Sequence, residues 1–181
     1  MIDDDEKEAR EYLIEQARRD ERLQQIDDLK RKGELISSPL YTPHNDTETP
    51  VYCGPTAMAA ITGESISVIE DAIHRVAVTG MYDVQLLAAM ELLGWYVVEE
   101  WSSNGVRYTL DAFAKDHGRD GPFIVAVTRH FVAISEGEFC DTGTMAPCDL
   151  LSALDQSRCW CKRIGSTWVH SWWQFAQLLG V

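Results

Sequence analysis

The sequence predicts an α+β domain in which helices come first and an antiparallel β-sheet follows. Two observations lead to this class. Between residues 53 and 93, apolar residues recur at helical spacing, and Gly63 and Gly94 follow two of these runs as helix ends. Between residues 121 and 143, runs rich in β-branched and aromatic residues are separated by short turns, which is typical of β-hairpins. Helical and strand patterns that stand in separate parts of the chain indicate α+β.

The chain of 181 residues is long enough for one domain with a core and an appendage. Residues 1–33 form a strongly charged helical pattern with sparse apolar points, and no Gly or Pro interrupts it before Gly33. We interpret this segment as a helical extension, either solvated or serving as an arm that binds a protein partner. Residues 34–52 are interpreted as a linker or extended segment, and residues 53–181 as the main domain.

Cys53 begins the first helical pattern and is the leading candidate for a nucleophile. Pro55 suits the first turn of a helix, where a missing N–H is harmless, and Gly63 is a plausible end. A helix N-terminus offers unpaired N–H groups and a partial positive charge. Such a position lowers the pKa of a cysteine below its usual value of about 8.5 and favours the reactive thiolate. The alternative is a buried cysteine in a short core helix.

The other elements follow from the same rules. Each expected helix has apolar residues at helical spacing or a cap residue, and the expected strand is apolar and aromatic. Helices are predicted over 67–78, over 83–93 and over 109–117 with Thr109 as cap, and a strand over 95–98. The pattern Ser171-Trp172-Trp173-Gln174 fits a capping box and predicts a final helix that reaches Leu179.

A hairpin brings a second chemical group into reach. The strand that begins at His130 is followed by the turn Glu136-Gly137-Glu138 and by a strand that leads to Asp141. Antiparallel pairing places the start of the first strand beside the end of the second, so the imidazole and the carboxylate are expected to be adjacent. Thiol, imidazole and carboxylate are the parts of an activated cysteine nucleophile.

These residues carry a resemblance to a known family. The motifs Cys53-Gly54-Pro55-Thr56-Ala57, His130-Phe131-Val132-Ala133-Ile134 and Asp141-Thr142 resemble those of papain-like cysteine peptidases, particularly the small C39-like branch and compact versions from bacteria and their phages. The resemblance covers roughly residues 40 to 165. It implies a helical half that carries the cysteine, packed on an antiparallel sheet that carries the histidine and the acid, with the active site in the cleft between them.

The sequence departs from that family at the oxyanion site. Papain-like enzymes carry a glutamine a few residues before the cysteine, whereas no Gln lies between Gln25 and Cys53 here. We expect Asn45 to supply the missing amide N–H, with Thr47 and Thr49 as further donors. The alternative is that Asn45 is an ordinary turn asparagine.

Three functions are compatible with this set of residues. The first is a cysteine-dependent hydrolase of peptide or isopeptide bonds, in which Cys53, His130 and Asp141 act through a thioester. The second is a catalytically weak or inactive interaction protein that keeps the papain-like fold and binds a partner through its N-terminal helix. The third is an acyl transferase in which an amine resolves the same thioester.

Four further cysteines lie at Cys140, Cys148, Cys159 and Cys161. A zinc site with His117 or His170 as extra ligands is possible, but the Cys-x-Cys spacing is not that of a zinc knuckle, so free thiols are the preferred interpretation. We therefore expect neither a metal nor a cofactor. His170 is also a weaker competitor for the role of base, because it has no acid close downstream.

The charge and the apolar pattern limit the partners. A net charge of −13 disfavours nucleic acid and anionic membrane surfaces, so a protein or peptide substrate is expected. No signal-peptide pattern and no apolar run long enough to span a membrane is present. The expected location is the cytoplasm, or the host cytoplasm if a phage encodes the protein.

Overall fold

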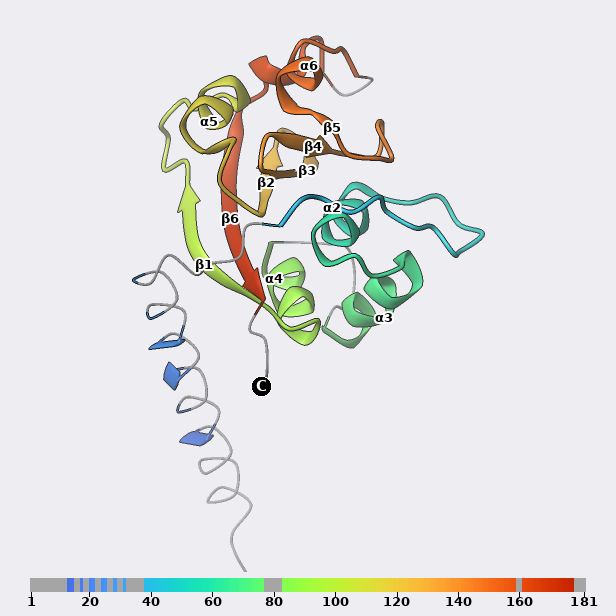
Figure 1. The fold of residues 1–181 in the computed structure, drawn as a ribbon, viewed down its shortest axis with the longest axis vertical. Coiled ribbons are helices and arrows are strands. Elements are labelled where there is room, and N and C mark those ends of the chain that lie inside the picture. The colour runs from blue at the N-terminus through green and yellow to red at the C-terminus, as the bar shows by residue number, and fades with distance from the viewer. Residues whose placement is uncertain are drawn as a thin grey trace, which may run out of the picture. The chain divides into compact units, whose positions relative to one another are not determined.

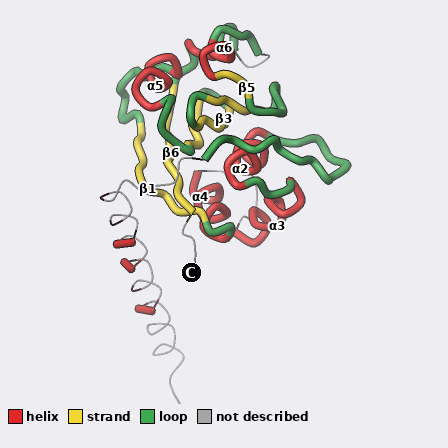
Figure 2. Tube along the Cα trace, viewed as in Figure 1, coloured by secondary structure: helices red, strands yellow, loops and turns green. Residues whose placement is uncertain are grey.

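The computed structural model divides the chain into two units, Met1–Ile36 and Ser37–Val181. The structure describes residues 38–76, 83–158 and 161–177, together with scattered residues between 13 and 31. Those scattered residues are helical, as expected of the N-terminal extension, and the rest of the expected extension lies outside the described residues. The second unit contains all the elements treated below (Figures 1 and 2).

The second unit combines helices with one antiparallel sheet, which is the α+β class that the sequence predicts. Its elements in chain order are α2 (Cys53–Thr62), α3 (Ile66–Val76), α4 (Asp83–Leu92), β1 (Trp95–Ser102), α5 (Leu110–His117), β2 (Phe123–Val127), β3 (His130–Ser135), β4 (Glu138–Cys140), β5 (Cys148–Asp149), α6 (Leu150–Leu154), the 3-10 turn η1 (Ile164–Ser166) and β6 (Val169–Gln177). The strands lie in the order β1-β6-β2-β3-β4-β5.

Both faces of the sheet are buried, because side chains that alternate along β2 enter two different cores. Ile124 and Ala126 pack with apolar residues of α2, α3 and α4. Phe123, Val125 and Val127 pack with residues of α5 and α6 on the other face. Figure 1 shows α5 and α6 above strands β2 to β5 in the view, and α2, α3 and α4 below them. The unit is therefore a sheet between two helical layers.

Helix α2 lies within the first of these cores. Its residues from Gly54 to Ile61 are all buried, as expected of a short helix rich in alanine and other apolar residues. Gly63 ends the helix in the left-handed conformation, with φ of 75°, and its N–H donates to the carbonyl of Ala59 at 2.9 Å. The predicted start at Cys53 and the predicted end at Gly63 are both confirmed.

The extended segment before α2 is attached to this helical layer. The Tyr41 N–H donates to the Ala60 carbonyl at 2.7 Å, and Leu40 is buried in the same core. Asp46 accepts from the N–H of Ser67 at 2.9 Å, at the start of α3. Residues 38–52, the described part of the segment 34–52 that the sequence suggested as a linker or extended segment, thus contact the main domain through Leu40, Tyr41 and Asp46.

The final helix predicted from the capping-box pattern is wrong for residues 171–177, which belong to strand β6. This strand lies between β1 and β2, and its neighbouring tryptophans serve opposite cores, Trp172 on the α5 side and Trp173 on the α2 side. Large aromatic side chains at period two fill both layers, which outweighs a local Ser and Gln spacing. Residues 178–181 lie outside the described residues.

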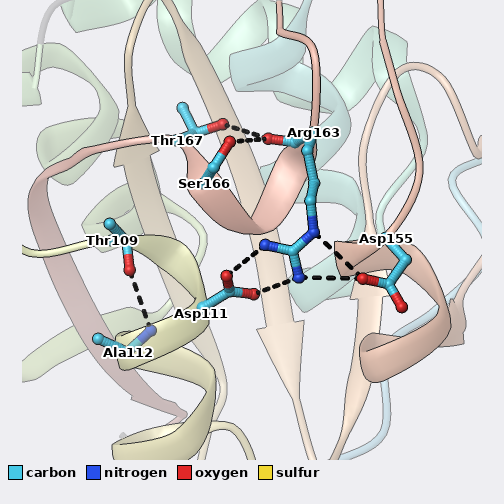
Figure 3. Close-up of polar contacts among 7 residues, drawn as sticks. All are labelled: Thr109, Asp111, Ala112, Asp155, Arg163, Ser166 and Thr167. Atoms are coloured by element: carbon cyan, nitrogen blue, oxygen red, sulfur yellow. Dashed lines mark hydrogen bonds and ion pairs between the residues drawn. The ribbon is translucent and has the colours of Figure 1, made fainter.

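A polar cluster joins α5 to α6, in the helical layer that covers the face of the sheet opposite to α2 (Figure 3). The guanidinium of Arg163 donates to Asp111 of α5 and to Asp155 at the end of α6, with Nη2 at 3.1 and 2.9 Å from the two carboxylates. Thr109 caps α5 as predicted, since its hydroxyl accepts from the Ala112 N–H at 3.3 Å. The cluster fixes the outer helical layer without reaching the candidate site.

Candidate active site

Cys53 is the first residue of α2, and its thiol is half-buried. Tyr52 precedes it in extended conformation, and the first N–H of the helix that bonds back to Tyr52 is that of Thr56, at 3.0 Å. The N–H groups of Cys53 and Gly54 therefore belong to the end of the helix that has no intrahelical acceptors. The thiol lies at the positive end of the helix dipole.

Several contacts stabilise the ionised thiol. Burial raises the pKa of Cys53, but a hydrogen bond with His130 and the backbone N–H groups of Phe131 and Gly54 outweigh it, so this pKa lies below its ordinary value. Burial raises the pKa of Cys140 to about 12 and also raises that of Cys148. Among these three thiols, Cys53 is the one whose surroundings favour the thiolate.

His130 reaches the site from the start of β3. A two-residue turn joins β2 to β3, with Val127 paired to His130, and Arg129 adopts a φ of 62° in that turn. His130 is 8% exposed. Burial lowers the pKa of the imidazole, but its hydrogen bonds with Asp141 and Cys53 raise this pKa by more than burial lowers it. The pKa of His130 therefore lies above its ordinary value.

Asp141 follows β4 directly and is fully buried. One carboxylate oxygen, Oδ1, accepts from the N–H groups of Gly143 and Thr144 at 2.9 and 2.8 Å. The other, Oδ2, lies 3.4 Å from Nε2 of His130. Burial raises the pKa of Asp141, but the contacts with His130, the two N–H groups and the charge of Arg158 hold it below its ordinary value.

The structure thus brings Cys53, His130 and Asp141 together, although the first two lie 77 residues apart in the chain (130 − 53). The Asp-Thr-Gly segment is at the same time an ordinary turn, since it closes on the Asp141 carboxylate. Turn and ion pair use different oxygens of the carboxylate, so one residue serves both.

Asn45 lies in an exposed turn, and the structure does not bring it into the site. Its side-chain oxygen accepts from the N–H and the hydroxyl of Thr47, at 3.0 and 2.8 Å. Its amide nitrogen donates to the carbonyl of Thr49 at 3.3 Å. This is the geometry of a turn asparagine, the alternative that the sequence left open. One amide N–H is used within the turn, and the side-chain contacts of Asn45 are with Thr47 and Thr49 rather than with Cys53 or His130.

Two contributors were missed by sequence reasoning. The N–H of Phe131 faces the Cys53 thiol, and Nε of Arg158 lies 3.7 Å from Oδ2 of Asp141. Every residue except proline has a backbone N–H, so the type of residue at position 131 does not indicate this contact. Arg158 lies in a segment with no recognisable motif, so nothing in the sequence indicated that it would reach Asp141.

The two histidines suggested as zinc ligands have other neighbours. His117 packs against Trp172 with ring centroids 5.0 Å apart and planes tilted by 48°, and Nε2 of His170 lies 3.2 Å from the Thr128 hydroxyl. Within the described part of the chain, no three His, Cys, Asp or Glu side chains gather as metal ligands would. Cys159 lies outside that part.

Within the same described residues, none of the helices has the length and apolar character needed to cross a bilayer.

The comparisons with known proteins give little. No protein-family profile matches the chain, and no curated protein matches it at a significant level. The chain is similar to a solved double glycine motif protease from an AMS/PCAT transporter, in complex with the leader peptide, with 13% identity over 78% of this chain and 95% of that one, and a TM-score of 0.48. Such a likeness is too distant to assign a function, so the proposal below rests on this chain's own side chains.

Proposed function

We propose that the protein is a cysteine-dependent hydrolase that acts on an amide bond of a protein or peptide. The observation that carries this proposal is the continuous contact from Asp141 through His130 to Cys53, with 3.4 Å between the carboxylate and Nε2 of the ring. Since Nε2 faces Asp141, Nδ1 is the ring nitrogen left for the thiol. Nucleophile, base and orienting group in this order are what cysteine catalysis requires.

In the proposed reaction, His130 holds the proton of Cys53, and the thiolate attacks the carbonyl carbon of the substrate. The C–N bond then breaks, and the leaving amine takes the proton from the imidazolium. Water attacks the resulting thioester and gives a proton to His130, the C–S bond breaks as the acid product leaves, and the thiolate and imidazolium are restored. Asp141 keeps the ring in the tautomer and orientation that both transfers need.

The oxyanion of the tetrahedral intermediate needs hydrogen-bond donors. Asn45 is engaged within its turn, so the proposal assigns this role to the backbone N–H of Cys53, which lies at the helix end without an intrahelical acceptor. Gly54 leaves the neighbouring backbone open for the approach of a carbonyl.

The test is selective labelling of Cys53. The intact protein is treated with iodoacetamide and, separately, with an epoxysuccinyl peptide, and the modified cysteine is identified by peptide mass spectrometry. We expect Cys53 to react at least tenfold faster than Cys140 and Cys148 at pH 6.5, because the pKa of Cys53 is lowered and the other two are raised. His130→Ala should slow the labelling of Cys53 at pH 6.5 while the protein stays folded, because it removes the hydrogen bond and the charge that lower the pKa of the thiol. Equal rates at the three thiols would refute the proposal.

One observation favours a second candidate, the catalytically weak interaction protein. The side chain of Asn45 is held in its own turn by Thr47 and Thr49, so the side-chain donor expected from the sequence does not contact the site. Labelling by iodoacetamide without labelling by the epoxysuccinyl peptide would support this candidate, because the small reagent needs only a thiolate whereas the peptide needs a substrate site.

A further inference from the structure

Arg158 lies against the buried end of the proposed catalytic chain. Its Nε is 3.7 Å from Oδ2 of Asp141, the same oxygen that faces His130 at 3.4 Å. The side chain of Arg158 is only 17% exposed, and its buried Nε has no hydrogen-bond partner among the described residues. One carboxylate oxygen therefore lies between two cations that come from different parts of the chain.

Gly143 makes this approach possible. A Cβ atom at position 143 would lie 2.5 Å from Nε and 2.9 Å from Cδ of Arg158, closer than non-bonded atoms can come. The N–H of the same glycine donates to Oδ1 of Asp141 at 2.9 Å. The arginine is thus seated on the turn that holds the carboxylate, and glycine at position 143 gives it the room.

The charges of this cluster balance only when Arg158 is included. Thiolate, imidazolium and Asp141 carboxylate sum to −1, and the guanidinium brings the sum to zero. The other charged or titratable groups that interact with the carboxylate and its neighbours are Cys140 and Glu138 of β4 and Cys148 and Asp149 of β5. Since burial keeps the two thiols protonated in the neutral range and both other groups are carboxylates, none of the four supplies a positive charge.

We propose that Arg158 is a positioning residue of the Cys53–His130–Asp141 site, which neutralises Asp141 and sets the pH range over which the thiolate and imidazolium coexist. This inference rests on the proposed function. Among the described residues the guanidinium contacts Asp141 and the Ser157 carbonyl and not the Cys53 thiol, so it acts through Asp141. The lowered pKa of Asp141, to which the charge of Arg158 contributes, is consistent with this role.

Two opposite effects on the pH profile separate this role from a merely structural one. Loss of a positive charge makes every proton in the cluster harder to remove, so the pKa of the thiol and the pKa of the imidazolium both rise. Loss of packing that frees Asp141 from His130 would instead lower the pKa of His130, since the carboxylate stabilises the charged ring. The upper limb of the pH profile reports the pKa of the His130 imidazolium. It therefore moves to higher pH when only the charge is lost and to lower pH when the packing is lost.

The experiment measures the rate of Cys53 alkylation by iodoacetamide between pH 4 and 10, read at Cys53 by peptide mass spectrometry. Arg158→Met keeps the size of the side chain and removes its charge. The midpoints of both limbs of the profile should move to higher pH, by about half a pH unit to one pH unit. Arg158→Lys keeps the charge and should leave both limbs near those of the wild type. Gly143→Ala pushes Arg158 away and should shift both limbs in the same direction as Arg158→Met. The control Arg119→Gln, at an exposed position, changes the net charge equally and should shift neither limb.

The result decides between distinct failures. A wild-type profile without a limb below the ordinary thiol pKa would refute the proposed function itself. A wild-type profile with that limb, and an Arg158→Met profile that coincides with it, would overturn the inference about Arg158 alone. A fall of the upper limb in Arg158→Met, with reduced rate throughout, would also overturn it in favour of a packing role.

Discussion

Replacing Asp141 by Asn tests whether the buried carboxylate is a charged anchor of the fold as well as of the site. The carboxylate is fully buried, accepts two backbone N–H groups and faces two cations. Asparagine has nearly the same shape and keeps one acceptor oxygen for the turn. Its NH₂ group would face His130 and Arg158, where a negative charge now lies.

The expected loss of stability follows from these contacts. A hydrogen bond to a charged group contributes about 1.5–3 kcal/mol, and a neutral one about 0.5–1.5, so two bonds lose about 2 kcal/mol together. The guanidinium of Arg158 loses its partner but is partly exposed, which adds about 1 kcal/mol. The sum, about 3 kcal/mol, is a large share of the roughly 5–15 kcal/mol by which domains are stable.

The assay is urea unfolding of the wild type and Asp141→Asn at pH 7 and at pH 3. The native pKa of Asp141 lies below its unfolded value of about 3.9, so its contribution is complete above that value and is lost as the pH falls through the native pKa. The difference between the two proteins should therefore shrink at pH 3. Asp71→Asn, at an exposed position of α3, is the control and should change stability by less than about 0.5 kcal/mol.

A difference of equal size at both pH values would refute the electrostatic reasoning, because it would show that shape rather than charge is lost. No difference at pH 7 would refute the view that the carboxylate anchors this turn.

Three further predictions follow from single contacts. Cys53→Ser should remove a pH-dependent contribution to stability. The lowered pKa of Cys53 gives a contribution that is complete above the unfolded value of about 8.5 and is lost as the pH falls through the native pKa, at no more than about 1.4 kcal/mol per pH unit. Urea midpoints that vary identically with pH in both proteins would contradict this. Asn45→Ala should keep the rate at which Cys53 is acylated by p-nitrophenyl acetate within about threefold, whereas a fall of about a hundredfold or more would restore Asn45 as an oxyanion donor. Thr109→Val removes the cap on the Ala112 N–H and should lower the free energy of unfolding by about 1 kcal/mol, and an unchanged urea midpoint would show that the cap contributes nothing.

The features that sequence reasoning predicted are those set by local signals. The start of α2 at Cys53, its end at Gly63 and the cap at Thr109 each depend on a few neighbouring residues, and the structure confirms all three. The hairpin that carries His130 toward Asp141 also depends on one short turn between two strands, so the pairing of β3 with β4 was predictable.

The errors arose where local and distant contacts compete. Ser171 and Gln174 have the spacing of a capping box, yet the segment forms a strand, because Trp172 and Trp173 fill cores on opposite faces of the sheet. At Asn45, by contrast, contacts within the turn determine where the side chain lies. The amide is a suitable oxyanion donor by type, but Thr47 and Thr49 satisfy it within the turn.

The protein carries a net charge of −13, which by itself opposes the formation of a thiolate. Distant surface charges are screened beyond about 8 Å at physiological ionic strength, so the groups in contact with the site decide its ionisation. Those groups are the imidazole of His130, the N–H groups of Gly54 and Phe131 and, through Asp141, the guanidinium of Arg158. These groups come from three parts of the fold, namely α2, strand β3 and the segment after α6. Lowering the pKa of one cysteine in an acidic protein therefore depends on the sheet and α2 being packed together, which is why no single motif in the sequence specifies it.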